Sequence, residues 1–106
     1  MFESTKIQVA LADEAVERGR ANVAGLHAAG QHAKAAFYAS GLRLAEGHRR
    51  LVREYLADGL EWVPYVDGGG YWADPEHLHR LVAEARLGLI PWFDLSLFDT
   101  TEELAA

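Results

Sequence analysis

The chain contains no cysteine, and its three prolines all lie at or beyond residue 64. Without cysteine there are no disulfides, no thiolate nucleophile and no cysteine-ligated zinc or iron–sulfur centre. Long apolar runs are missing too: LGLIPWF, the best candidate, is far shorter than the roughly 20 residues that span a bilayer. The first residues lack the basic start and apolar core of a signal peptide. We therefore expect a cytoplasmic protein without a membrane segment.

Bulky apolar side chains are scarce in the first half of the chain. Half of the 106 residues count as hydrophobic, but many of these are alanine, which buries little area. A single domain over residues 1–106 that relies on so few large side chains is marginal as a monomer, which favours self-association or a partner. The large core candidates in this half are Ile7, Val9, Leu11, Val16, Val23, Leu26, Phe37, Leu42, Leu44, Leu51, Val52 and Leu56.

The stretch from Ser4 to Leu56 has the composition of helices, because it is free of proline and rich in alanine, glutamate, arginine and leucine. A seven-residue repeat runs through it, and such spacing predicts an apolar stripe that faces a packed partner. The repeat consists of Val9, Val16, Val23, Gly30, Phe37, Leu44 and Leu51.

A single helix over residues 4–57 would be about 80 Å long, far longer than a compact domain of this size. We therefore predict an antiparallel helical hairpin with helices at roughly 5–29 and 32–57. In this prediction Gly30 ends the first helix with a positive φ angle, which glycine adopts easily.

Two alternatives to the hairpin stay open. In an unbroken rod, Gly19, Gly30 and Gly41 would align along one face and leave a smooth groove for another backbone. In the other alternative, a second break falls at Gly47.

The second half of the chain changes character after a glycine at position 59. Residues 60–73 read as a small aromatic β-ribbon or loop with a glycine-rich turn, in which Pro64 requires an edge position. An Asp-Pro pair then predicts the start of a third helix over 74–88. Residues 89–106 form an apolar segment, which we expect to pack back on the core, and a polar tail. The predicted fold is all-α: a long helical hairpin plus a short third helix.

Large aromatic side chains gather in and after the ribbon. Tryptophan and tyrosine dominate binding hot spots, but they also fill cores better than any other residue. We expect a mixture, with Trp62 and Trp92 inside and Tyr65 or Tyr71 at a rim. The candidate partner anchors are Trp62, Tyr65, Tyr71, Trp72, Trp92 and Phe93.

Catalytic and metal-binding patterns are weak. His27 and His32 are five residues apart, and on one helix their rings would diverge by about 140°, whereas chelation needs a spacing of three or four. No serine lies in a nucleophile motif, and most carboxylates near the ribbon are explained by a turn, a helix cap or a first helical turn. We predict no catalytic residue, no metal ligand and no cofactor, and we regard an enzyme as the less favoured class.

Residues 45–73 resemble the end of a winged helix-turn-helix domain, in which a recognition helix ends at Gly-Leu and a two-stranded wing follows. The resemblance implies that Arg49, Arg50 and Arg53 contact DNA, with Arg43 upstream. This chain departs from the pattern: the tight turn between two short helices is missing, and the wing carries Asp67 and no basic residue. The net charge of −6 also opposes non-specific attraction to nucleic acid.

From the sequence we therefore predict a small soluble helical protein that acts by macromolecular association. It would be an accessory subunit, adaptor or inhibitor that binds a protein partner or forms an oligomer with itself. Two alternatives remain: a winged-helix-like DNA-binding regulator, and a small-ligand-binding protein or enzyme with an aromatic pocket.

Overall fold

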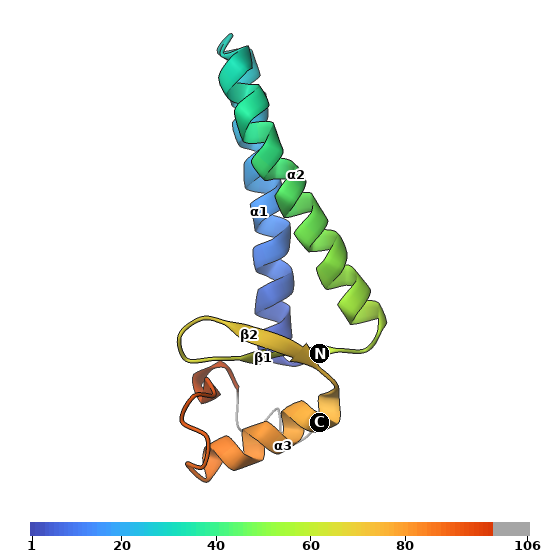
Figure 1. Cartoon of the computed structure of the whole chain (residues 1–106), viewed down its shortest axis with the longest axis vertical. Coiled ribbons are helices and arrows are strands. Elements are labelled where there is room, and N and C mark those ends of the chain that lie inside the picture. Colours follow the sequence, from blue (N-terminus) through green and yellow to red (C-terminus); the bar gives the residue numbers. More distant parts are fainter. Residues whose placement is uncertain (99–106) are drawn as a thin grey trace. The chain divides into compact units, whose positions relative to one another are not determined.

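The computed structural model describes residues 1–98 and is mostly helical (Figure 1). The chain divides into two compact units. We call residues 9–54 the hairpin unit, and residues 1–8 with the segment from Tyr55 onward the ribbon unit. The predicted polar tail, 99–106, lies outside the described residues. The elements are α1 (Glu3–Ala28), α2 (His32–Ala57), β1 (Glu61–Pro64), β2 (Gly70–Ala73), α3 (Pro75–Arg86) and the short 3-10 helix η1 (Leu95–Leu97).

The predicted hairpin is confirmed. Gly30 has φ +75°, and the turn is closed by hydrogen bonds from Gly30 N to His27 O at 3.0 Å and from Gln31 N to Leu26 O at 2.9 Å. This pair of bonds satisfies carbonyls that the end of α1 would leave free. The unbroken rod and the break at Gly47 are both wrong, because α2 continues through Gly47 as one helix of 26 residues.

Small side chains let α1 and α2 approach each other in the hairpin unit. Val16 on α1 and Ala35 on α2 are fully buried. A Cβ atom at Gly19 would lie 3.0 Å from Leu42 Cδ1, so glycine at this position makes room for the facing helix. Two exposed ion pairs also join the helices, Arg20–Glu46 at 3.3 Å and Arg53–Asp13 at 3.7 Å.

The predicted seven-residue stripe does not stay on one buried face. On α1 the stripe residue Val16 is buried, but on α2 Phe37 is 74% exposed, Leu44 78% and Leu51 42%. The turn at Gly30 interrupts the helical phase, so a repeat counted through it does not continue on the same side. The assignment of these three α2 residues to the core, and of the half-exposed Leu11, was therefore wrong.

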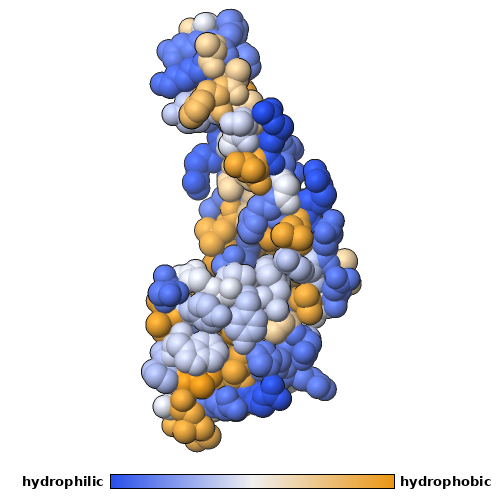
Figure 2. All heavy atoms as spheres, in the orientation of Figure 1, coloured by the Kyte–Doolittle hydropathy of each residue, from blue (hydrophilic) through white to orange (hydrophobic). Residues whose placement is uncertain are grey.

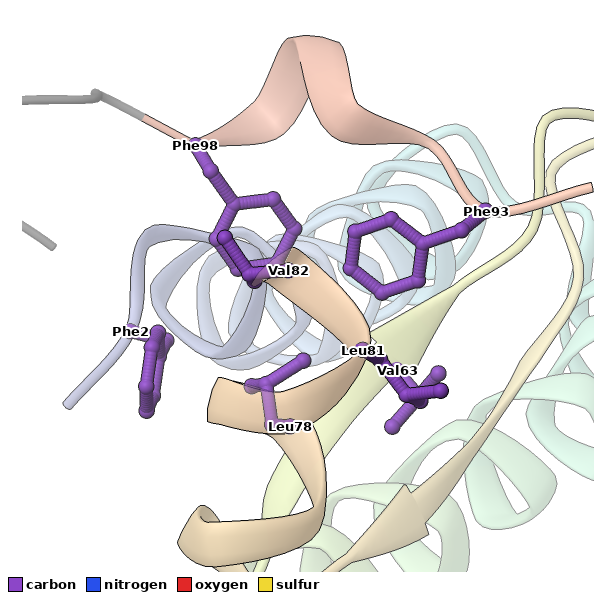
Figure 3. Close-up of a cluster of buried hydrophobic side chains, with 7 residues drawn as sticks. All are labelled: Phe2, Val63, Leu78, Leu81, Val82, Phe93 and Phe98. Atoms are coloured by element: carbon purple, nitrogen blue, oxygen red, sulfur yellow. The ribbon is translucent and has the colours of Figure 1, made fainter. Parts of the chain in front are cut away.

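The main apolar cluster belongs to the ribbon unit (Figure 3). Its side chains come from the residue just before α1, from β1, from α3 and from the segment after α3, and they point toward one another. The predicted third helix is confirmed, and Asp74 caps it by accepting a hydrogen bond from His77 N at 2.9 Å. The cluster consists of Phe2, Val63, Leu78, Leu81, Val82, Phe93 and Phe98.

The predicted ribbon is an antiparallel pair of strands, so the class all-α describes the fold only in part. Trp62 pairs with Trp72 and Val63 with Tyr71. Gly70 lies so close to the Val63 carbonyl and the Trp62 ring that it has no room for a Cβ atom. The glycine-rich segment is therefore a tight turn whose last glycine allows the two strands to pack closely.

A polar latch joins the first turn of α1 to β1. The carboxylate of Glu61, only 9% exposed, accepts hydrogen bonds from Phe2 N at 2.7 Å and from Thr5 Oγ1 at 2.8 Å. Thr5 Oγ1 accepts from Trp62 N at 2.8 Å, and Ser4 Oγ donates to Trp62 O at 2.7 Å. A negative charge at the N-terminus of α1 also interacts favourably with the helix dipole.

The first prediction concerns this latch. Glu61→Ala removes the acceptor of two buried donors, and each unmet donor costs about 1–3 kcal/mol. We expect the free energy of unfolding, measured in urea by circular dichroism, to fall by about 2 kcal/mol or more. Glu61→Gln keeps one oxygen and should lose less, while the exposed Glu14→Ala should stay within about 0.5 kcal/mol. Equal losses in Glu61→Ala and Glu14→Ala would contradict the latch.

The second prediction separates the hairpin from a rod. Gly30→Ala should lower the free energy of unfolding by about 1–2 kcal/mol, because alanine resists a positive φ angle. Gly41→Ala should raise it by about 0.5–1 kcal/mol, since this glycine is in the interior of α2 with open space around it. If both substitutions stabilised the protein, the turn at Gly30 would not exist in solution.

Candidate functional site

Strand alternation divides the aromatic residues of the ribbon into two groups. Successive side chains of a strand point to opposite faces, so the pair Trp62–Trp72 lies on one face and Tyr71 on the other. On the first face Trp72 stacks on Tyr55, with ring centroids 5.3 Å apart, and meets Trp62 at 5.4 Å.

The second group of aromatic rings lines a pocket of about 380 Å³. Tyr65 is the central ring: its centroid lies 5.9 Å from that of Tyr71 and 5.6 Å from that of Trp92. Val66 and Asp67, from the turn of the ribbon, complete the lining. Such a volume falls in the lower part of the range of about 300–1,000 Å³ typical of small-ligand sites.

Backbone hydrogen bonds hold the walls of this aromatic pocket. Tyr65 N donates to Gly69 O at 2.8 Å, and Val66 N donates to Trp92 O at 2.9 Å. Asp67 Oδ1 accepts from Gly69 N at 2.9 Å, which fixes the turn. The pocket therefore depends on a segment that follows α3, a contribution that the sequence alone did not reveal.

The six predicted anchors thus fall in three environments. Trp62 and Trp72 are half-buried on one face, and Tyr65 and Tyr71 are half-buried beside the pocket, as expected for a rim. The expectation that Trp92 lies inside was wrong, because it is 40% exposed at the pocket. Phe93, only 3% exposed, belongs to the apolar cluster.

A chain of polar groups extends from Tyr71 into α3. Tyr71 Oη lies 2.8 Å from His77 Nε2, and His77 Nδ1 lies 2.8 Å from Arg80 Nη2. A guanidinium group only donates hydrogen bonds, so Nδ1 must accept here and the proton of a neutral imidazole sits on Nε2. His77 then donates to Tyr71, which leaves the tyrosine hydrogen free to meet another acceptor.

His27 and His32 meet at the tip of the hairpin, with their Nδ1 atoms 2.8 Å apart. The expectation that they diverge was wrong because it assumed one helix, whereas the turn folds one residue back beside the other. Across residues 1–98, no group of three or more histidine, cysteine or acidic residues is placed to hold a metal ion.

The four arginines of the DNA-binding alternative all lie on α2. Arg43 and Arg50 are exposed, Arg49 is half-buried, and Arg53 pairs with Asp13. The ribbon follows α2 in sequence, as a wing would, but α2 is one long helix. Within the described part of the chain, the two short helices and tight turn that precede a wing are absent.

Apolar side chains at the surface of the hairpin form a second candidate site (Figure 2). We call Phe37, Leu44 and Leu51 the α2 ridge. They are spaced by seven residues, so they follow one side of the helix. Their exposed fractions, between 42% and 78%, are unusual for large apolar residues on a well-packed helix.

The third prediction concerns the ionisation of Tyr71. Burial, then the neighbouring Tyr65, raises the pKa of Tyr71 above its ordinary value of 10.0, and the Arg80 guanidinium lowers it in part. Because the pKa of Tyr71 is raised in the folded state, the folded protein favours the neutral phenol. The contribution of this neutral phenol to the free energy of unfolding is complete below the unfolded pKa of about 10 and is lost as the pH rises through the folded pKa.

Ultraviolet titration of the tyrosinates measures this effect, with Tyr71→Phe identifying the Tyr71 component. Arg80→Met should raise the pKa of Tyr71 further, and Tyr65→Phe should lower it. Tyr38→Phe, on α2, should leave it unchanged. The same Tyr71 pKa in Arg80→Met and Tyr65→Phe would show that these neighbours do not act on the phenol.

Comparison of the chain with known protein families, with characterised proteins and with solved structures found no match. None of the helices in residues 1–98 combines the length and the apolar character needed to cross a membrane. Two surfaces of the described chain remain as functional candidates: the aromatic pocket and the α2 ridge.

Proposed function

We propose that this protein is a binding module, and that the α2 ridge docks an acidic amphipathic helix of a partner protein. The observation that supports the proposal is the exposure of Phe37, Leu44 and Leu51 on one side of a long helix. Exposed apolar patches on soluble proteins mark interaction sites. An accessory subunit, adaptor or inhibitor would act through such a surface.

The spacing of the ridge favours a helix as its occupant. A seven-residue repeat is the pattern of coiled-coil packing, in which side chains of one helix insert between those of another. If the ridge takes the first position of each heptad, the fourth position holds Ser40, Gly47 and Glu54. Ser40 and Gly47 leave space between the large residues, so a partner helix can approach closely and insert its own bulky side chains there.

The charges that flank the ridge favour an acidic partner over a second copy of α2. The flanking fifth and seventh positions of the heptads hold Lys34, Ala36, Gly41, Arg43, His48 and Arg50, without a carboxylate. Charges at these positions decide which helices pair. Two copies of α2 packed ridge to ridge would bring lysine and arginine together, whereas glutamate on a partner helix would pair with them.

The expected affinity is moderate and depends on salt. Burial of a large apolar side chain contributes about 1.5–3 kcal/mol. Phe37 and Leu44, about three-quarters exposed, would therefore contribute roughly 2–5 kcal/mol together. A micromolar complex needs about 8 kcal/mol, so the basic flanks and the remaining contacts must supply the rest. Added salt would screen the flank contribution.

The fourth prediction uses two synthetic helices of about four heptads with leucine at the first and fourth positions. One carries glutamate at the flanking positions and the other carries lysine. By fluorescence anisotropy the protein should bind the glutamate helix and not the lysine helix. Leu44→Gln should weaken binding at least tenfold, because a truncated hot-spot residue costs about 2 kcal/mol or more. The Arg43→Gln, Arg50→Gln double variant should flatten the salt dependence.

Two controls make this experiment decisive. Leu87→Gln changes an equally exposed leucine in the ribbon unit and should leave binding unchanged. Light scattering should show that the free protein stays monomeric. Equal binding of both synthetic helices, or a stable dimer that Leu44→Gln dissociates, would contradict an acidic foreign partner.

The same variants address the DNA-binding alternative. A DNA reader should bind duplex DNA with a steep salt dependence, and the arginine variants should weaken this binding while Leu44→Gln has no effect. That outcome would contradict docking of a partner helix and support DNA binding instead.

A further inference from the structure

We propose that the aromatic pocket is a separate site for a methylated ammonium group, the positively charged head of a quaternary amine. The pocket belongs to the ribbon unit and the α2 ridge to the hairpin unit. This inference therefore goes beyond partner-helix binding and does not depend on it.

The walls of the pocket are mostly aromatic. Three of the five lining residues are Tyr65, Tyr71 and Trp92, and the faces of such rings attract cations. The planes of Tyr65 and Trp92 are nearly perpendicular, at 86°, so the two rings form a corner. Their centroids lie 5.6 Å apart in an edge-to-face contact, and both rings line the same pocket, so one ligand can touch both.

The charge at the pocket is negative. Asp67 is the one charged residue among those that line it, and a carboxylate at the rim favours a cation. The nearest base along the polar chain, Arg80, contacts His77 and does not line the pocket. An anionic ligand would meet Asp67 and the negative faces of three rings, so the pocket excludes it.

The pocket walls favour a methylated ammonium over an ordinary one. A lysine-type ammonium is a compact, strongly hydrated charge with three hydrogen-bond donors that all need acceptors. Walls of Tyr65, Trp92 and Val66 offer it mainly apolar surface. Methyl groups replace these donors and pack against the rings, while the charge remains available for the ring faces and for Asp67.

The site is also open and held in shape. Trp92 is 40% exposed and Val66 62%, so a ligand reaches them from solvent. The backbone bonds Tyr65 N to Gly69 O and Val66 N to Trp92 O hold two of the walls before a ligand arrives. A pocket that is already formed loses less entropy on binding.

The test is calorimetric titration of the full-length protein with tetramethylammonium and with choline, against sodium chloride of equal ionic strength. The neutral analogue 3,3-dimethylbutan-1-ol has nearly the shape of choline without its charge. We expect both cations to bind and the neutral alcohol to bind at least tenfold more weakly. Equal binding of choline and the alcohol, or no binding of either cation, would overturn the proposal.

Variants locate the binding in the pocket. Trp92→Ala should weaken choline binding at least tenfold, and Asp67→Asn should weaken it severalfold while its side-chain oxygen still accepts from Gly69 N. Tyr38→Phe, on α2 and not part of the pocket lining, should leave choline binding unchanged. If Trp92→Ala does not fold, Asp67→Asn and the neutral alcohol still decide the matter. Unchanged binding in Asp67→Asn together with equal binding of the alcohol would contradict the site.

The same chemistry occurs on free choline-like molecules and on trimethylated lysine side chains of proteins. Titration with a short peptide that contains trimethyllysine, beside its unmethylated twin, distinguishes the two sources. Tighter binding of the methylated peptide than of choline assigns the site to protein side chains, and the reverse order assigns it to small free cations. Equal binding of the methylated and unmethylated peptides would contradict recognition of the methyl groups.

Discussion

The close approach of α1 and α2 at Gly19 is the constraint on which the hairpin unit depends. Gly19 faces Leu42, and the buried residue on α2 near the turn is Ala35. Small side chains fill this contact, and the buried residues of α2 are Ala35 and Val52. Phe37 and Leu44 remain outside, on the surface that we propose as the docking face.

The ribbon unit differs from the hairpin unit, because it has many large aromatic rings and few long elements. The buried Glu61 ties the first turn of α1 to β1, which brings Phe2 into the apolar cluster. Strand alternation then sends one set of rings to each face of the ribbon. The pocket arises where the chain after α3 returns and places Trp92 against Tyr65.

Local signals in the sequence were enough to predict much of the fold. Gly30 and the pair Asp74-Pro75 mark helix ends by their own backbone preferences, and both ends were predicted correctly. The features that were missed depend on distant contacts. The Glu61 latch joins residues up to 59 positions apart, and the exposure of Trp92 follows from where the chain returns after α3. The sequence shows the heptad repeat, but it does not show which side of α2 the repeat occupies after the turn at Gly30.

The free energy of unfolding of Leu44→Ala, compared with that of Val16→Ala, tests most directly whether the α2 ridge lies outside the hairpin core. If it does, truncation of Leu44 changes the free energy of unfolding by less than about 0.5 kcal/mol. Val16→Ala, at a buried site, should cost clearly more. A loss of about 2–5 kcal/mol for Leu44→Ala, typical of a buried leucine, would contradict the account and place the ridge inside the fold.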